Sequence, residues 1–202
     1  MIKAQPSSSD MAAHTAAQLA GNAWPPHALP NEADDIMPAI SAAEFRDALA
    51  YAATAVTVLA TAGPAGIAGV TCSAVCSVCD TPATILFCVN RGSAANSVLK
   101  ANGFVSVNWL NSQQADVSQL FAGIGHVPMQ NRFEDERWQT SAHGVPYRAD
   151  ALIALDCRIA QAIEIGTHSV FLARVLGAMR ADGADPLVYC QRAYATTRPA
   201  QS

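Results

Sequence analysis

Residues 69–79 restrict what this chain can fold into more than any other segment. Their small and β-branched side chains predict a strand, in which successive side chains point to opposite faces. The first face carries Thr71, Ser73, Val75 and Ser77, and the second carries Val70, Cys72, Ala74, Cys76 and Val78. The second face suits a protein core, whereas the hydroxyls of the first face suit either water or close approach of a polar ligand.

The rest of the chain continues this pattern of strands, with few helices between them. Helices are expected after the cap residue Ser41, over 94–101 and over 115–121. This composition of elements predicts an antiparallel barrel rather than alternating strands and helices. No Rossmann glycine motif, P-loop or nucleophile elbow occurs. Further strands are expected at 54–61, 83–89, 104–110, 152–165, 170–180 and 187–190.

The first 38 residues differ from the remainder. They are rich in proline, serine and alanine, which predicts a flexible N-terminal extension with a short helix at 11–19. Docking of this extension on a partner subunit is the alternative. The folded domain is expected over 39–202, because only this part of the sequence has the pattern of strands.

Composition excludes several classes of function. The 202 residues are 51% apolar and 14% charged, with a net charge of −4 and no basic stripe, so nucleic acid is not expected as a partner. No apolar run approaches the roughly 20 residues of a membrane helix, and no secretion signal is recognised, which predicts a cytoplasmic protein. The six cysteines read as reduced, buried thiols. Cys72, Cys76 and Cys79 lack the spacing of zinc ligands, so no metal is expected.

Several short motifs recur in a fixed order along the chain. Together they resemble the flavin reductase family of split-barrel proteins over 40–198, and within it most closely the reductase components of chlorophenol and 4-hydroxyphenylacetate monooxygenases. The motifs are Phe45-Arg46-Asp47-Ala48, the strand 71–78, Val107-Asn108, Phe121-Ala122-Gly123, Arg132-Phe133, Arg137-Trp138-Gln139-Thr140 and Gly166-Thr167-His168.

The resemblance implies a mostly β fold, a six-stranded antiparallel split β-barrel of Greek-key type with a few flanking helices. It implies a homodimer with flavin near the subunit interface. The implied activity is that of an NADH-dependent flavin reductase, with FAD preferred over FMN, that supplies diffusible reduced flavin to a separate aromatic monooxygenase. Alternatives are an FMN reductase serving a pyrimidine oxygenase or corrin reduction, and a split-barrel flavin-binding protein without turnover.

The resemblance also implies a set of site residues. No catalytic side chain is required, because hydride passes directly between the two cofactors. His168 and Tyr194 are implied to contact the pyridine nucleotide, although many relatives have Gly-Asp-His where this chain has Gly166-Thr167-His168. Without the resemblance, Arg91 reads as a solvated charge, and Phe121 and Tyr194 read as core or interface residues. The implied flavin contacts are Thr71, Cys72, Ser73, Ala74, Val75, Ser77, Val78, Cys88, Val89, Asn90, Arg91, Ser93, Phe121, Ala122 and Gly123.

Overall fold

The computed structural model describes residues 40–198. The chain divides into two units, Met1–Ala42 and Ala43–Ser202. Almost all of the first unit lies outside the described residues, together with the expected extension 1–38 and its helix at 11–19.

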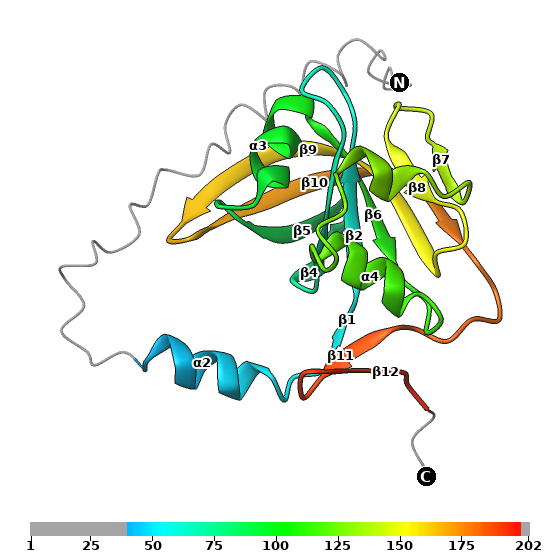
Figure 1. The fold of residues 1–202 in the computed structure, drawn as a ribbon. Helices are drawn as coiled ribbons and strands as arrows, with labels where there is room; N and C mark the ends of the chain where they lie inside the picture. Colours follow the sequence, from blue (N-terminus) through cyan, green and yellow to red (C-terminus); the bar gives the residue numbers. More distant parts are fainter. Residues whose placement is uncertain (1–39, 199–202) are drawn as a thin grey trace, which may run out of the picture. The chain divides into compact units, whose positions relative to one another are not determined.

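A seven-stranded antiparallel sheet forms the centre of the second unit (Figure 1). Its order is β3-β2-β6-β9-β10-β5-β4, and the strands β9 and β10, of 13 residues each, form a long hairpin. The mostly β class predicted from the sequence is therefore confirmed. The strands are β2 (Thr57–Thr61), β3 (Ala68–Cys72), β4 (Val75–Asp80), β5 (Ala83–Asn90), β6 (Phe104–Trp109), β9 (Ile153–Ile165) and β10 (His168–Arg180).

The expected strand at 69–79 is two strands, β3 and β4, which lie at opposite ends of the sheet order. Ser73 and Ala74 join them, and the backbone N–H of Cys88 in β5 donates to the Ala74 carbonyl at 3.0 Å. The link thus brings the two edges of the sheet together. Counting β3 and β4 as one bent strand recovers the six strands expected of the barrel.

The bend resets which side chains face the core, and this corrects the predicted assignment of faces. Cys72 is buried as expected, but on β4 it is Val75 that packs against the core, while Cys76 and Val78 are exposed. The physical reason is that Ser73 and Ala74 leave the regular ladder, so the period-two alternation does not continue across them.

Two smaller sheets complete the strands. The expected strand 54–61 is interrupted at Val56, which leaves its first two residues to pair elsewhere. One small sheet has the order β1-β11-β12, and the other pairs β7 with β8. Their bounds are β1 Thr54–Ala55, β7 Trp138–Thr140, β8 Pro146–Arg148, β11 Val188–Cys190 and β12 Ala193–Ala195.

The helices are short, and three of them were expected from the sequence. Helix α3 begins after Ser93, whose Oγ accepts from the Ala95 N–H at 3.3 Å. It ends at Asn102 and is followed by the capping residue Gly103, whose φ of 73° favours glycine. Helix α2 has no buried residue. No helix of residues 40–198 is long and apolar enough to cross a membrane. The bounds are α2 Ala42–Leu49, α3 Ala94–Asn102, α4 Ala115–Phe121 and the 3₁₀ helix η2 Gln130–Phe133.

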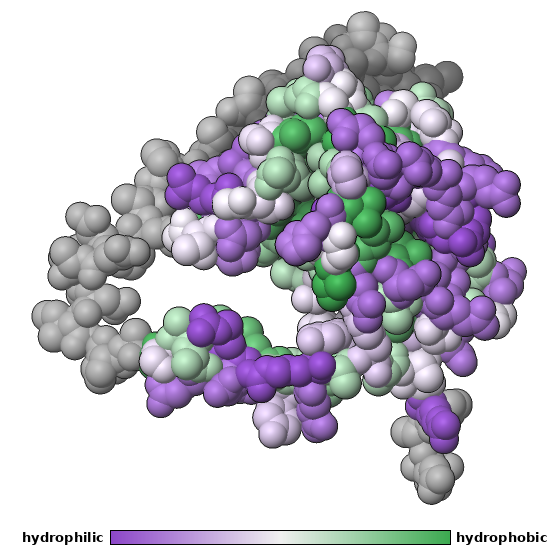
Figure 2. All heavy atoms as spheres, in the orientation of Figure 1, coloured by the Kyte–Doolittle hydropathy of each residue, from purple (hydrophilic) through white to green (hydrophobic). Residues whose placement is uncertain are grey.

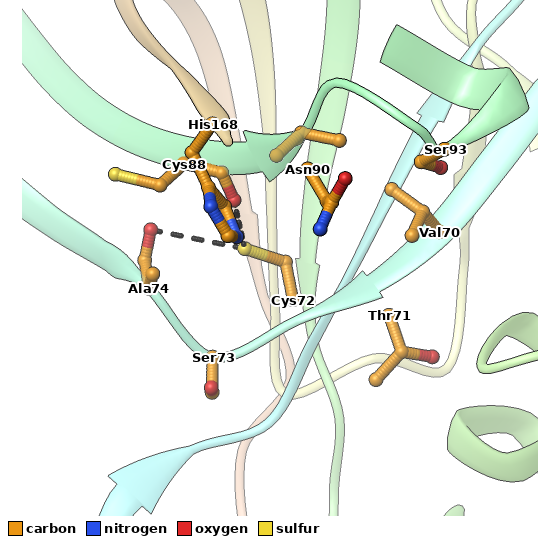
Figure 3. Close-up of a pocket in the computed structure, with 10 residues that line it drawn as sticks. Val70, Thr71, Cys72, Ser73, Ala74, Cys88, Asn90, Ser93 and His168 are labelled. Carbon is orange, nitrogen blue, oxygen red and sulfur yellow. Dashed lines mark hydrogen bonds between the residues drawn. The ribbon is translucent and has the colours of Figure 1, made fainter. Parts of the chain in front are cut away.

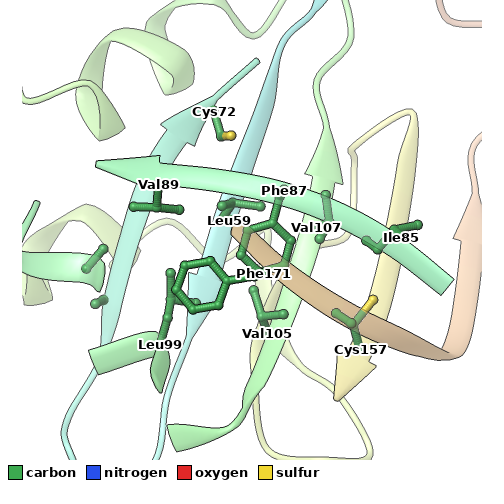
Figure 4. Packing of buried hydrophobic residues seen from close by; sticks show 13 residues of the cluster. Leu59, Cys72, Ile85, Phe87, Val89, Leu99, Val105, Val107, Cys157 and Phe171 are labelled. Atoms are coloured by element: carbon green, nitrogen blue, oxygen red, sulfur yellow. The ribbon is translucent and has the colours of Figure 1, made fainter. Parts of the chain in front are cut away.

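The core has two clusters. In the first, Phe87 and Phe171 are cross-strand partners on β5 and β10, and their rings stack with centroids 4.9 Å apart (Figure 4). In the second, Phe121 of α4 packs edge-on against Phe133 and Trp138, with centroids 5.0 and 5.3 Å away. Such aromatic groups supply much of the buried apolar area of a small domain. The surface is mixed, with apolar groups exposed among polar ones on the face seen in Figure 2.

All six cysteines are free thiols. Burial raises the pKa of Cys72 to about 11 and that of Cys157 to about 12, so both stay protonated at neutral pH. Cys76 and Cys79 are exposed, which corrects the expectation that all of the thiols are buried. The exposure of Cys76 follows from the bend before β4, and Cys79 comes after a register shift between β4 and β5.

Candidate functional site

A pocket of about 250 Å³ lies where the link between β3 and β4 faces the end of β5 and the start of β10 (Figure 3). None of its lining residues carries a carboxylate, and most side chains are small. The backbone is therefore accessible to a ligand along much of the wall. The lining residues are Val70, Thr71, Cys72, Ser73, Ala74, Cys88, Val89, Asn90, Ser93 and His168.

The link at Ser73 and Ala74 is held against β5 by sulfur and backbone hydrogen bonds. The Cys72 thiol donates to the Cys88 carbonyl at 3.3 Å and approaches the Ala74 carbonyl at 3.7 Å, as Figure 3 shows. A thiol with a raised pKa remains a donor, so these contacts persist at neutral pH. This wall of the pocket is consequently ordered although it is not a regular strand.

The hydroxyl of Thr71 has a different partner from the one expected. Its Oγ1 donates to the backbone carbonyl of Ser118 in α4 at 2.6 Å, so the hydroxyl ties β3 to the helix. Ser73 remains exposed. Of the three hydroxyl residues predicted on one face of the strand, Thr71 and Ser73 line the pocket, whereas Ser77 lies beyond the bend and does not.

The opposite end of the pocket is the start of α3. Asn90 Oδ1 accepts from the Gly92 N–H at 2.7 Å, and Ser93 caps the helix. A helix N-terminus combines unpaired N–H groups with the positive end of the helix dipole, which favours an anion. Because no residue lining the pocket carries a carboxylate, this end of the pocket is suited to a phosphate group.

His168 enters the pocket from the turn between β9 and β10. Gly166 occupies the left-handed region at φ 51°, which allows the two-residue turn, and His168 then pairs with Asn90 in the β5–β10 ladder. Thr167 Oγ1 lies 2.9 Å from Nδ1 of His168. The threonine hydroxyl thus contacts the imidazole.

Several predicted site residues do not line this pocket. Phe121 is 2% exposed and belongs to the second core cluster. Tyr194 donates its hydroxyl to Ser118 Oγ at 2.9 Å and packs edge-on against Tyr189. Arg91 points to the β9–β10 turn, where its Nε is 3.0 Å from Glu164 Oε2. The remaining residues that the pocket does not include are Val75, Ser77, Val78, Ala122 and Gly123.

Sequence reasoning missed two features beside the pocket. Val70 lines it although the alternation had assigned this residue to the core. A second hollow of about 680 Å³ adjoins the pocket at Ser73 and Ala74. The motif that includes Arg46 was the one sequence feature in this region, but it does not indicate that Tyr189 and Arg192, far along the chain, line the same hollow. The other residues lining this hollow are Arg46, Leu49, Ala50, Ala52, Thr54, Tyr189 and Arg192.

Residues 49–198 match the flavin reductase like domain. The chain therefore belongs to the flavin reductase family.

Two curated relatives are similar over most of their length. The FMN reductase (NADH) RutF of Ancylobacter novellus is 45% identical over 157 residues, which cover 78% of this chain and 86% of that protein. The 4-hydroxyphenylacetate 3-monooxygenase reductase component of Pseudomonas aeruginosa is 43% identical over 150 residues, covering 74% and 88%.

Solved structures agree with the family. The flavin reductase component BorF of a bacterial two-component tryptophan halogenase has a TM-score of 0.73 at 29% identity, covering 79% of this chain and all of that one. The NADH:FAD oxidoreductase SgcE6 of Streptomyces globisporus, in complex with NAD and FAD fragments, has a TM-score of 0.72 at 25% identity, covering 79% and 94%.

Proposed function

We propose that this protein oxidises NADH, reduces a flavin bound in the pocket between the 73–74 link and α3, and releases the reduced flavin to a separate oxygenase. The observation that carries the proposal is the pocket itself. It combines an accessible backbone wall, a helix N-terminus for a phosphate and His168 at its rim. The family and the names of the similar reductases support the same reaction.

The chain's own residues bind and orient rather than react. Thr71 to Ala74, with Cys88 and Val89, lie along the flavin ring and its ribityl chain, while Asn90 and Ser93 hold the phosphate end. When bound, the flavin supplies the hydride acceptor, so the protein has only to place the nicotinamide against it. His168 contacts the nucleotide, and no lining side chain is needed as a general base.

Two combinations of flavin and oxygenase partner are candidates. The sequence resemblance and the 43% identical reductase component favour an aromatic monooxygenase, with FAD as the flavin. The 45% identical FMN reductase favours FMN and a RutF-like role. Initial rates of NADH and NADPH oxidation with FMN, FAD and riboflavin decide the cofactors. Addition of purified candidate oxygenases then decides the partner.

A flavin-binding protein without turnover is the competing class of function. It would bind flavin in the same pocket and leave the NADH concentration unchanged. Steady NADH oxidation over many equivalents of protein excludes that class.

Replacing His168 with alanine is expected to impair use of the nucleotide more than use of the flavin. His168 lines the pocket, and its imidazole has a hydrogen-bond contact with the Thr167 hydroxyl. Its loss should lower kcat/KM for NADH by about 10-fold, equivalent to about 1.4 kcal/mol. Steady-state kinetics with each substrate varied measure this. A selective rise in the flavin KM with wild-type NADH kinetics contradicts the assignment.

An apolar sheet face beside the pocket supports a homodimer. Cross-strand partners share a face, so Ile163, Val170 and Cys88 form one outward row, and Gln161, Leu172, Leu86 and Cys76 form the next, with Gln161 as its polar end. Ile163 is 39% exposed, and Cys88 also lines the pocket. Contiguous exposed apolar surface is typical of an interface. A second copy of this chain is the proposed occupant, because the face is continuous with a pocket that the resemblance places near a subunit interface.

Introducing a charge on this face is expected to dissociate the dimer. Leu172→Lys places an ammonium among the apolar rows, where burial in an interface without a partner is unfavourable. Light scattering after size-exclusion chromatography should give a dimer for the wild type and a monomer for the variant. Ala101→Lys, on the exposed side of α3, is the control that should remain a dimer. A monomeric wild type, or a dimeric Leu172→Lys, contradicts the proposal.

A further inference from the structure

Glu164, near the end of β9, receives donors from three different elements. Its Oε2 is 3.0 Å from Nε of Arg91 and accepts from Ser169 Oγ at 2.9 Å. Its Oε1 accepts from Nζ of Lys100 in α3 at 2.5 Å. The Lys100 contact, followed by that of Ser169, lowers the pKa of Glu164, so the carboxylate is ionised at neutral pH. Glu164 is thus the common acceptor of the β5–α3 turn, α3 and β10.

Arg91 reaches from the β5–α3 turn around the turn that precedes His168. Its backbone N–H donates to the Thr167 carbonyl at 2.9 Å, and its Nη1 donates to the Gly166 carbonyl at 3.2 Å. The same guanidinium pairs with Glu164 through Nε. A planar guanidinium can satisfy two acceptors at once, which a lysine ammonium cannot do in the same geometry. Arg91 therefore fixes both residues of the turn.

The residue after His168 is fixed from the buried side. Ser169 is fully buried, and its hydroxyl accepts from Nδ2 of Asn96 at 3.0 Å while donating to Glu164. Asn96 Nδ2 also donates to the Val89 carbonyl at 3.0 Å, next to the pocket wall. Buried polar groups satisfied in this way resist rearrangement. The network thus connects the pocket wall at Val89 to the backbone on the C-terminal side of His168.

The imidazole itself has few restraints. Over residues 40–198 its only hydrogen-bond contact is with the neighbouring Thr167 hydroxyl. The turn is exposed, and Gly166 allows it more conformational freedom than another residue would. The place of the ring at the pocket rim accordingly depends on the contacts that hold the residues on either side of it.

We propose that Glu164 and Arg91 are positioning residues that hold the 166–168 turn so that the His168 imidazole stays at the pocket rim, where NADH meets the flavin. The proposal rests on the function proposed above. It also changes the expected role of Arg91. The guanidinium is engaged with Glu164 and Gly166, so it acts on the nucleotide side through the turn instead of binding the flavin phosphate.

Glu164→Gln tests the proposal in the full-length protein. Glutamine keeps the size of the side chain and can still accept from Ser169, but it removes the charge that Arg91 and Lys100 contact. The expected result is a fall of about fivefold in kcat/KM for NADH, with the flavin KM within twofold of wild type. Arg91→Lys retains the backbone bond to Thr167 and the charge but not the forked contact, so it should show the same pattern.

A double variant separates positioning from a general structural role. In His168→Ala the imidazole is absent, so adding Glu164→Gln should lower kcat/KM for NADH no further. Asp182→Asn is the control, because it neutralises the carboxylate of a more exposed ion pair, Asp182–Arg180 at 2.9 Å, whose residues do not line the pocket. It should leave both sets of kinetics unchanged.

Three outcomes overturn the inference. One is wild-type NADH kinetics in both Glu164→Gln and Arg91→Lys while His168→Ala lowers them. Another is a full multiplicative loss in the double variant, and the third is a selective loss of flavin affinity in Arg91→Lys. These differ from failure of the proposed function, which would appear as absent NADH turnover in the wild type.

Discussion

Ser93→Asp is expected to lower kcat/KM for FMN by about 100-fold while leaving that for riboflavin close to wild type. Aspartate caps helices as well as serine does, so α3 should remain intact. Its carboxylate, however, would lie at the end of the pocket proposed for the phosphate. Two unit charges about 5 Å apart repel by about 3 kcal/mol at an effective dielectric constant near 20, which corresponds to that order of loss.

Riboflavin makes this prediction specific, because it has the same ring and lacks the phosphate. Ser93→Asn is the control variant, since asparagine caps the helix without a charge. Initial rates at saturating NADH, with each flavin varied, give the comparison. An equal loss with both flavins would mean that the substitution damages the pocket generally, and unchanged FMN kinetics would place the phosphate elsewhere.

Arg148→Met is expected to destabilise the fold by about 3 kcal/mol, the low end for removing one partner of a buried ion pair, because Asp135 and Asp150 are 30% and 33% exposed. Arg148 is 2% exposed, and its guanidinium lies 2.9 Å from Asp135 Oδ2 and 2.5 Å from Asp150 Oδ1. It also lies over the Trp138 ring, 5.7 Å from the centroid. Methionine leaves both carboxylates without this cation. For a domain of this size the melting temperature should fall by about 10 °C.

Arg137→Met is the matched control, because Arg137 contacts the same two carboxylates but is 57% exposed. Its effect on the melting temperature should be much smaller, because solvent screens the pair.

Hydrogen bonding to Arg137, and then to Arg148, keeps the pKa of Asp135 below its ordinary 3.8. That contribution to stability is fully present above the ordinary value and is lost as the pH falls through the folded one. Thermal unfolding at pH 7 therefore measures the full loss of stability. A similar fall in melting temperature for Arg148→Met and Arg137→Met would contradict the prediction.

The sequence predicted the strands better than it predicted how they bend. Alternation and turn residues located the long strands β9 and β10 and the capped helix α3. The prediction of one continuous strand was wrong at 73–74, because small residues such as Ser73 and Ala74 are compatible with either a continuous strand or a bend. The long-range contacts distinguish the two, because β3 pairs with β2, β4 pairs with β5, and the Cys88 N–H donates to the Ala74 carbonyl.

The candidate site divides in a similar way. Asn90 and Ser93 could be predicted as a helix cap, which is a local feature, and His168 was predicted from the resemblance of its motif; all three line the pocket. The contact of Arg91 with Gly166 joins residues 75 positions apart, and its partner Glu164 was not singled out. Such contacts depend on the register of β5 against β10, which residue spacing alone does not determine.

We infer that flavin is a substrate of this protein, which binds and leaves in each turnover. The direct test is NADH oxidation by gel-filtered protein, measured with and without added FMN or FAD. We expect almost no oxidation without flavin and a saturable rate with it. In air, hydrogen peroxide should accumulate in step, because oxygen reoxidises the released flavin. Full activity without added flavin, with one equivalent of flavin still bound after filtration, would contradict this account, as would flavin binding without any NADH turnover.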